Sequence, residues 1–157
     1  MNATDAERHL LTGTLPLNTK VEGNLDLSNT AITSLPEELS MGGYLDLEGT
    51  SITALPEGLS VRGDLYLRYT AITSLPAGLS VGGNLDLRYT AITALPAGLR
   101  VGGYLDLEDT PIRSLPEGLS VGGSLYLPDG TVLAGAKLPG VRLDGLNTIA
   151  AFVALTD

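Results

Sequence analysis

A 20-residue period runs through the chain without a gap and constrains its fold more than any other feature. Five full copies occupy residues 21 to 120, and a sixth begins at Val121 and decays after Thr131. A partial copy precedes the first, because Leu15-Pro16 matches Leu35-Pro36. A gapless repeat of this length is typical of solenoids, in which each coil contacts only its neighbours. The sequence therefore predicts one stacked array of small, similar units.

Apolar residues recur within each copy at positions that a stacked coil can bury. Leu25 and Leu27 alternate with Asp26, which is the period of a β-strand and places both leucines on one side. Each copy has about six such inward positions, which are first filled by Leu25, Leu27, Ile32, Leu35, Leu39 and Met41. A single copy could not bury them, whereas stacked copies can. The pattern predicts a parallel β-solenoid.

Residues with special backbone properties also recur once per copy. A proline in each return segment leaves little room for a helix, so we expect extended or short 3₁₀ structure there. Glycine pairs such as Gly82-Gly83 precede the strand, where they permit either positive φ or close approach between coils. We expect a threonine row to bond the backbone of the turn after the strand. This row is Thr30, Thr50, Thr70, Thr90 and Thr110.

The shared pattern L-x-L-x-x-T-x-I-x-x-L-P-x-x-L resembles a bacterial leucine-rich repeat. Its Leu-Pro pair and length are similar to those of the short-repeat class in enterobacterial secreted effectors. The longer phrase LPEGLSVGG-x-LDL-x-x-T-x-I resembles repeat proteins of bacteria and their phages. The resemblance covers about residues 15 to 131 and implies a leucine-rich-repeat-like solenoid whose strand row forms a concave face. Thr replaces the usual Asn, and only 26 residues follow Thr131, so no ubiquitin-ligase domain is implied.

The segments outside the repeat are predicted to be caps, because the terminal cores of a solenoid need covering. The predicted organisation is an N-terminal helical cap over 1–14, a solenoid over 15–131 and a C-terminal cap over 132–157. Thr4-Asp5-Ala6-Glu7 has the pattern of a capping box. It predicts a helix over about 5–12 that covers the first coil with Ala6, Leu10 and Leu11.

The C-terminal cap is predicted to end in a second helix. Asn147 is its expected N-cap, and residues 148–155 are apolar on nearly all sides. Helices of that kind are buried, so this one is expected either to fold onto the last coil or to join two chains into a homodimer.

Composition narrows the classes of function. The chain has no Cys and a single His, which excludes disulfides and thiolate-bound metals and argues against a His-based metal site or catalytic triad. Lys and Arg number 9 against 18 Asp and Glu, a net charge of −9, so we expect no direct nucleic-acid binding. The sequence contains no phosphate-loop motif and no carboxylate pair in two distinct environments. We therefore expect no enzymatic activity, no cofactor and no metal.

Targeting signals are equally sparse. The N-terminus, MNATDAERHLL, lacks the apolar run of a signal peptide, and the longest apolar stretch, Ile149 to Leu155, is too short to span a bilayer. We expect a protein that uses no membrane and lies in the cytoplasm of a bacterial host. The absence of Cys is also compatible with secretion into a host cell.

The outward residues of the strand row are not needed for the core and form the candidate site. All six tyrosines fall there, and the strand segments of the five full copies carry nine acids and three bases. Tyr and Arg supply binding hot spots, and stacked aspartates that repel one another favour a cationic partner. The predicted partner-binding residues are Tyr44, Asp46, Tyr66, Arg68, Tyr69, Asp86, Arg88, Tyr89, Tyr104 and Asp106.

A simpler interpretation of the same residues stays open. Tyr suits strands in any context, and Asp keeps a sheet surface soluble. Under this interpretation, Glu48/Arg68 and Arg88/Glu108 are ordinary cross-strand charge pairs.

These observations predict a non-enzymatic protein-binding module whose acidic, Tyr-rich concave face engages a protein with a basic surface. The resemblance to phage repeat proteins implies one version, an inhibitor that occupies the nucleic-acid-binding groove of a host protein. Two alternatives remain: a secreted bacterial effector module that recognises a host protein, and a purely structural oligomeric repeat protein joined through its C-terminal helix.

Overall fold

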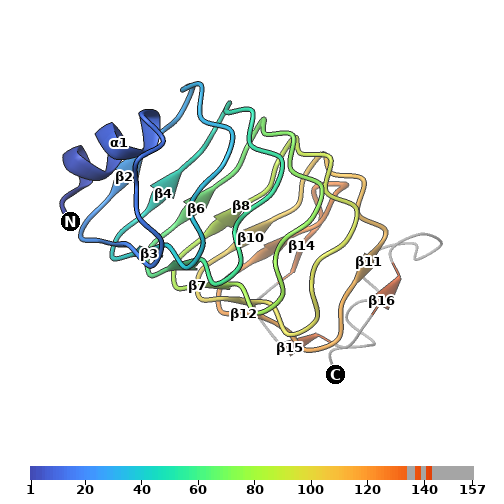
Figure 1. The fold of residues 1–157 in the computed structure, drawn as a ribbon. Helices are drawn as coiled ribbons and strands as arrows, with labels where there is room; N and C mark the ends of the chain where they lie inside the picture. Colours follow the sequence, from blue (N-terminus) through green and yellow to red (C-terminus); the bar gives the residue numbers. More distant parts are fainter. Residues whose placement is uncertain (134–136, 139–140, 143–157) are drawn as a thin grey trace.

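The computed structural model describes residues 1–133, 137–138 and 141–142. The chain winds into a parallel β-solenoid, as the repeat predicts, and equivalent residues of successive coils stack along one axis (Figure 1). Helix α1 (Ala3–Leu11) covers the N-terminal end of the stack. No helix in the described part of the chain is long and apolar enough to cross a membrane.

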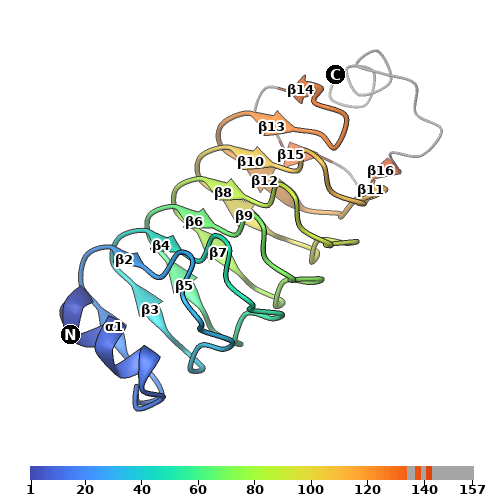
Figure 2. The ribbon, with the colours of Figure 1, turned by 90° about the horizontal axis from the view of Figure 1, so that it is seen from above.

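Each coil contributes two short strands, so the solenoid has two long sheets (Figure 2). We call the first the Ser-Val sheet; it contains β1 (Lys20–Val21), β3 (Ser40–Met41), β5 (Ser60–Val61), β7 (Ser80–Val81), β9 (Arg100–Val101), β12 (Leu119–Val121) and β15 (Lys137–Leu138). We call the second the Tyr-Asp sheet; it contains β2 (Leu25–Asp26), β4 (Leu45–Asp46), β6 (Leu65–Tyr66), β8 (Leu85–Asp86), β10 (Leu105–Asp106), β13 (Leu125–Tyr126) and β14 (Val132–Leu133). The strand row of the sequence analysis is the Tyr-Asp sheet, and the Ser-Val sheet was not predicted.

The core lies between the sheets and the return segments and consists of the predicted apolar rows. In the second coil, Leu45, Leu47 and Ile52 are fully buried, and the same positions are buried in every full coil. The parallel register pairs residues 20 apart, as in Leu85 with Leu105. Each buried Leu contributes roughly 1.5–3 kcal/mol through the apolar area that it removes from water.

Turn chemistry follows the prediction for Thr and decides between the alternatives for Gly. Every hydroxyl of the threonine row donates to the carbonyl of the Leu three residues earlier, at 2.7–2.8 Å. The glycines before the strands serve close approach: a Cβ on Gly82 would lie 2.1 Å from the Arg62 carbonyl oxygen. The return segments of the full coils contain no helix, and residues 91–96 are an example with no regular secondary structure.

The N-terminal cap differs in detail from the predicted one. Asn2, and not Thr4, is the N-cap of α1: its side chain accepts from the Asp5 amide at 2.8 Å and donates to the Asp5 carboxylate at 2.9 Å. Ala6 and Leu10 are buried, whereas Leu11 is 51% exposed. The helical period explains this, because Ala6 and Leu10 lie one turn apart on one face and Leu11 is rotated away from it.

The chain closes the C-terminal end by reversing direction. Antiparallel strands add to the last coil: β14 pairs with β13, β15 pairs with β12, and β16 (Val141–Arg142) pairs with β11 (Ser114–Leu115). Such pairing satisfies strand edges that would otherwise be open to other chains. The predicted helix over 148–155 lies outside the described residues.

Candidate protein-binding face

The candidate site is the outer face of the Tyr-Asp sheet together with the turn that follows each strand. In each full coil the two leucines of the strand segment are buried, and the residues between and beside them lie on the outside. Four columns of outward residues result, one coil apart along the stack. We name them by their members in the third coil: the Asp64, Tyr66, Arg68 and Tyr69 columns.

All ten predicted binding residues lie in these columns, but they differ in exposure. Tyr69 and Tyr89 are 56% and 47% exposed, the most exposed aromatics of the face. Asp86 and Asp106 are buried, at 1% and 7%. The remaining six are partly buried. The two buried aspartates therefore cannot contact a partner directly and can act only through the side chains that they hold in place.

The aspartates of the Tyr66 column have a structural task that the sequence analysis missed. Asp26, Asp46, Asp86 and Asp106 each accept a hydrogen bond from the backbone amide two residues later, at 2.9–3.1 Å. Asp side chains commonly fix a turn in this way. The signal was present in the sequence, because an Asp at the end of each strand precedes a tight turn in four coils. Tyr66 and Tyr126 take the same position without this bond.

The predicted stacking of like charges is present in the register. Asp26 pairs with Asp46, and Asp86 pairs with Asp106. Burial raises the pKa of Asp46, and the neighbouring Asp26 and Glu48 carboxylates raise it further. Hydrogen bonds from Ser28 lower the pKa of Asp26. The face therefore holds carboxyl groups in unlike environments along one column.

A chain of alternating charges crosses the centre of the face. Arg68 bonds to Glu48 through Nη2, and its Nε lies 3.5 Å from Asp86 Oδ2. Arg88 bonds to Asp86 through Nη2 at 2.7 Å, and its Nε lies 3.3 Å from Asp106 Oδ2. We call these five residues the charge ladder.

The ladder confirms one of the two predicted cross-strand pairs and corrects the other. Glu48 and Arg68 form the expected pair, but Arg88 pairs with Asp86 and Asp106 instead of Glu108. The reason is geometric: the Asp86 carboxylate lies between the two guanidinium groups. The hydrogen bond to Glu48 raises the pKa of Arg68, and the hydrogen bond to Asp86 raises that of Arg88. Both cations are thus largely neutralised within the face.

The six tyrosines form three aromatic pairs. Tyr44 with Tyr66, and Tyr104 with Tyr126, make edge-to-face contacts with centroids 6.2 and 5.9 Å apart. The hydroxyl of Tyr66 donates to Asp64 at 2.8 Å, and burial together with this acid raises the pKa of Tyr66 to about 12.

The third pair is different in geometry and in backbone. The Tyr69 and Tyr89 rings stack with centroids 4.8 Å apart and an interplanar angle of 2°. Both residues have φ of +57°, in the left-handed region. The column is otherwise filled by Asn29, Gly49 and Asp109, which adopt that region more readily. Tyr is bulky there, so the two central coils accept strain that residues of the other coils avoid.

No clustered metal site accompanies these residues. Within the described part of the chain, no group of three or more His, Cys, Asp or Glu side chains is arranged to hold a metal ion. The aspartates of the Tyr66 column instead direct their oxygens to backbone amides and, at the centre, to arginines.

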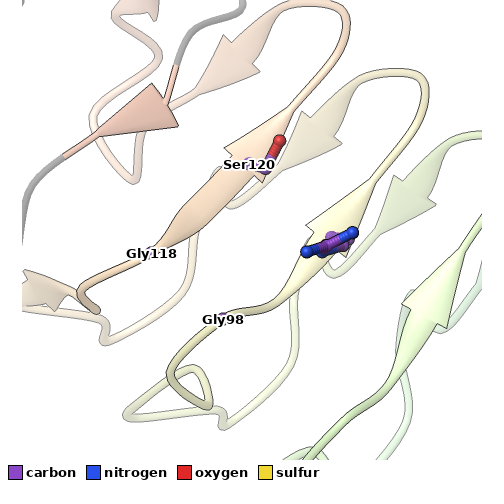
Figure 3. A pocket seen from close by; sticks show the side chains of 4 residues that line it. Gly98, Gly118 and Ser120 are labelled. Atoms are coloured by element: carbon purple, nitrogen blue, oxygen red, sulfur yellow. The ribbon is translucent and has the colours of Figure 1, made fainter.

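A shallow pocket lies apart from this face, beside the Ser-Val sheet. Its lining is Gly98, Arg100, Gly118 and Ser120 (Figure 3). Two of the four residues are glycines and only one is charged, so the pocket offers few groups for recognition or chemistry. It is a gap between neighbouring coils at β9 and β12.

The comparisons with known proteins add no relative to this description. No family model matches the chain, and neither a curated protein nor a solved structure matches it.

Proposed function

We propose that the protein is a non-enzymatic binding module that engages a protein with a basic surface through the outer face of the Tyr-Asp sheet. The observation that carries the proposal is the exposed Tyr69–Tyr89 stack in left-handed backbone. Strain of this kind persists where the surrounding structure enforces it, and it concentrates at functional sites. Stacked, solvent-facing tyrosines are the residue type that dominates binding energy in protein interfaces.

The charge of the face supports a basic partner. The two guanidinium groups of the ladder are held by three carboxylates, so they are not free for an anionic ligand. Acids that the ladder does not neutralise flank it on both sides: Asp26 and Asp46 on the N-terminal side, and Glu108 and Asp109 on the C-terminal side. The negative potential of these acids would raise the association rate of a protein with a basic surface, and added salt would weaken the binding.

Comparing equivalent positions of the coils separates residues that are constant along the stack from residues that vary. Positions that the coil geometry dictates are nearly constant from coil to coil, as the Leu and Thr rows are. The four outward columns vary instead between Asp, Tyr, Arg, Glu and Asn. Several polar members of these columns bond the backbone, as Asn24, Asp64 and Asn84 do by accepting an amide of the next coil. The coil geometry does not require the large tyrosines, and recognition of a partner is a reason for placing them there.

Capture from a bacterial lysate tests the proposal, with wild type compared to a Tyr69→Asn/Tyr89→Asn double variant. Asn tolerates the left-handed backbone, as Asn29 does in the first coil, so this variant keeps the fold. We expect one or more basic proteins on the wild type, lost from the variant and released by raised salt. Equal captures by both proteins, or empty captures by both, would count against the proposal and favour a purely structural role.

The inhibitor version of the proposal makes a stricter demand. If the acidic face occupies a nucleic-acid-binding groove, then duplex DNA must displace the captured protein, and the protein must block DNA binding by that partner in return. Capture that DNA leaves unchanged would keep the binding module and remove the inhibitor version.

A further inference from the structure

The Tyr69–Tyr89 stack has two outer ring faces, one on Tyr69 and one on Tyr89. The two residues take the same position in adjacent coils, so the stack runs along the coil axis and its outer faces look toward the coils on either side. On the N-terminal side the equivalent residue is Gly49, which has no side chain to cover Tyr69. The Asn29 side chain of the preceding coil reaches beside Gly49, because its Oδ1 lies 2.4 Å from where a Cβ on Gly49 would be. The space in front of the Tyr69 ring therefore lies outward of Asn29.

We propose that the free face of Tyr69 is a subsite for an arginine side chain of the basic partner, with the guanidinium group lying over Gly49. This inference rests on the proposed function and names the chemical group that the face recognises. The guanidinium would extend the stack by one member, in the place that a third tyrosine of the column would take.

The chemistry of the space fits a planar cation. A guanidinium group is flat, stacks on tyrosine rings and is attracted by their electron-rich faces, whereas a lysine ammonium is a compact, strongly hydrated charge. Asn29 Oδ1 supplies a hydrogen-bond acceptor at the edge of the subsite, and the guanidinium carries five donors in its plane. A ring face with a hydrogen-bond acceptor at its edge thus matches arginine better than lysine.

The opposite end of the stack favours a cation too. Asp109 takes the equivalent position in the coil beyond Tyr89, and its negative charge raises the pKa of the Tyr89 phenol. Nucleobases also stack on tyrosine, but their phosphates would meet the acids that flank the ladder. Arginine of a protein partner is therefore the occupant that both the ring faces and the charges favour.

Two peptides of equal length and charge, nona-arginine and nona-lysine, test the subsite on the full chain. Their dissociation constants are measured by fluorescence anisotropy at about 50 mM salt, where electrostatic binding is strong. We expect nona-arginine to bind wild type at least about fivefold more tightly than nona-lysine, in line with a cation–π contribution at an exposed site.

Variants then localise the preference. Gly49→Asn places a side chain in front of Tyr69, displaces the Asn29 side chain, whose Oδ1 would lie 2.4 Å from the new Cβ, and keeps a residue that tolerates the φ of +69° there. We expect it to reduce nona-arginine affinity about fivefold and to leave nona-lysine nearly unchanged. Tyr69→Asn/Tyr89→Asn should do the same. Gly58→Asn is the matched control, because it makes the same exchange at a φ of +73° on a return turn, where the new Cβ would likewise meet a side chain of the preceding coil, Glu38 Cγ at 2.8 Å. It should change neither affinity.

The outcomes separate this inference from the function on which it rests. Equal binding of both peptides, or an arginine preference that survives Gly49→Asn, overturns the arginine subsite and leaves a basic partner in place. Failure of the wild type to bind either peptide at low salt overturns the subsite and the basic-partner proposal together.

Discussion

The two sheets of the solenoid share coil spacing, strand length and parallel register, yet their outer surfaces differ. In the second to sixth coils, the outward positions of the Ser-Val sheet are nearly all Ser or Gly, with Arg62 and Arg100 as the exceptions. The Tyr-Asp sheet presents Tyr, Asp, Arg, Glu and Asn in changing order. Large aromatic and charged side chains thus concentrate on one of two sheets that share the same strand geometry.

The near-constancy of the Ser-Val sheet has its own physical reason. A Cβ on Gly102 would lie 2.1 Å from the Gly82 carbonyl oxygen, and Gly122 has the same relation to Gly102 at 2.2 Å. Backbone atoms at such distances cannot move aside as the end of a flexible side chain can. At Gly82, Gly102 and Gly122 the coils approach too closely for a Cβ, so these glycines are a packing requirement. In the second to sixth coils, Arg62, in the same row, is the one side chain that the approach of the coils admits.

The largest expected effect comes from a substitution beside the Ser-Val sheet. Gly102→Ala should lower the free energy of unfolding by about 3 kcal/mol, because the new methyl group overlaps the backbone of the previous coil. Gly98→Ala is the control: nothing lies within 4 Å of its Cβ, and only the φ of +72° opposes Ala, at a cost of about 1 kcal/mol. Urea denaturation of both variants measures the difference. Equal losses would show that close approach does not limit the Ser-Val side.

The second prediction concerns the charge ladder of the variable face. Asp86→Asn keeps an oxygen for the Arg88 amide but removes the charge between the two guanidinium groups. We expect the free energy of unfolding to fall by about 2 kcal/mol, the scale of a buried hydrogen bond to a charged group. Asp26→Asn makes the same exchange in the exposed first coil and should cost under about 0.5 kcal/mol. Similar losses for both would mean that the ladder contributes nothing specific.

The third prediction uses pH to test the environment of Asp46, a partly buried aspartate of the Tyr66 column. The pKa of Asp46 is raised in the folded protein, so ionising it costs stability; the cost is present above the folded pKa and absent below the unfolded value of 3.8. Asp46→Asn should therefore raise the free energy of unfolding at pH 7, by less than about 1 kcal/mol. The gain should vanish as the pH falls toward 3. Unfolding curves of wild type and variant between pH 3 and 7 measure this gain. A gain that persists at pH 3 would contradict the raised pKa of Asp46.

The solenoid could be predicted from the sequence because each apolar core position recurs in all five full copies. The parallel register follows from the gapless 20-residue period. The Ser-Val sheet escaped prediction because a strand such as Ser80–Val81 has a single apolar residue followed by glycine, here Gly82-Gly83, so the sequence shows no alternation there. The antiparallel closing strands escaped because the repeat has decayed by Val132 and no longer predicts pairing.

The sequence predicted which residues form the candidate site, but not which contacts their side chains make. Alternation placed eight of the ten residues on one face, and Tyr69 and Tyr89 were added as the residues that follow Arg68 and Arg88. That Arg88 pairs with Asp86 and not with Glu108 depends on side-chain geometry that sequence spacing does not contain. The left-handed backbone at Tyr69 and Tyr89 was also hidden. Asn29, Gly49 and Asp109 in the same column were the available signal, because these residue types share a tolerance for positive φ.

The smallest expected effect on stability belongs to the most exposed residues of the face. Tyr69→Asn/Tyr89→Asn removes a stacked pair worth about 1 kcal/mol, and it replaces two left-handed tyrosines by residues that adopt this region at a lower cost, so the two effects oppose each other. The free energy of unfolding should therefore stay within about 1 kcal/mol of wild type or rise slightly. Tyr66→Asn is the control within the same sheet; it loses a partly buried ring and the hydrogen bond to Asp64, and should cost about 2 kcal/mol. If urea denaturation shows a loss above about 2 kcal/mol for the double variant, the stack stabilises the coils. Its strain would then need no partner to explain it, and the contrast between the two sheets would be one of packing alone.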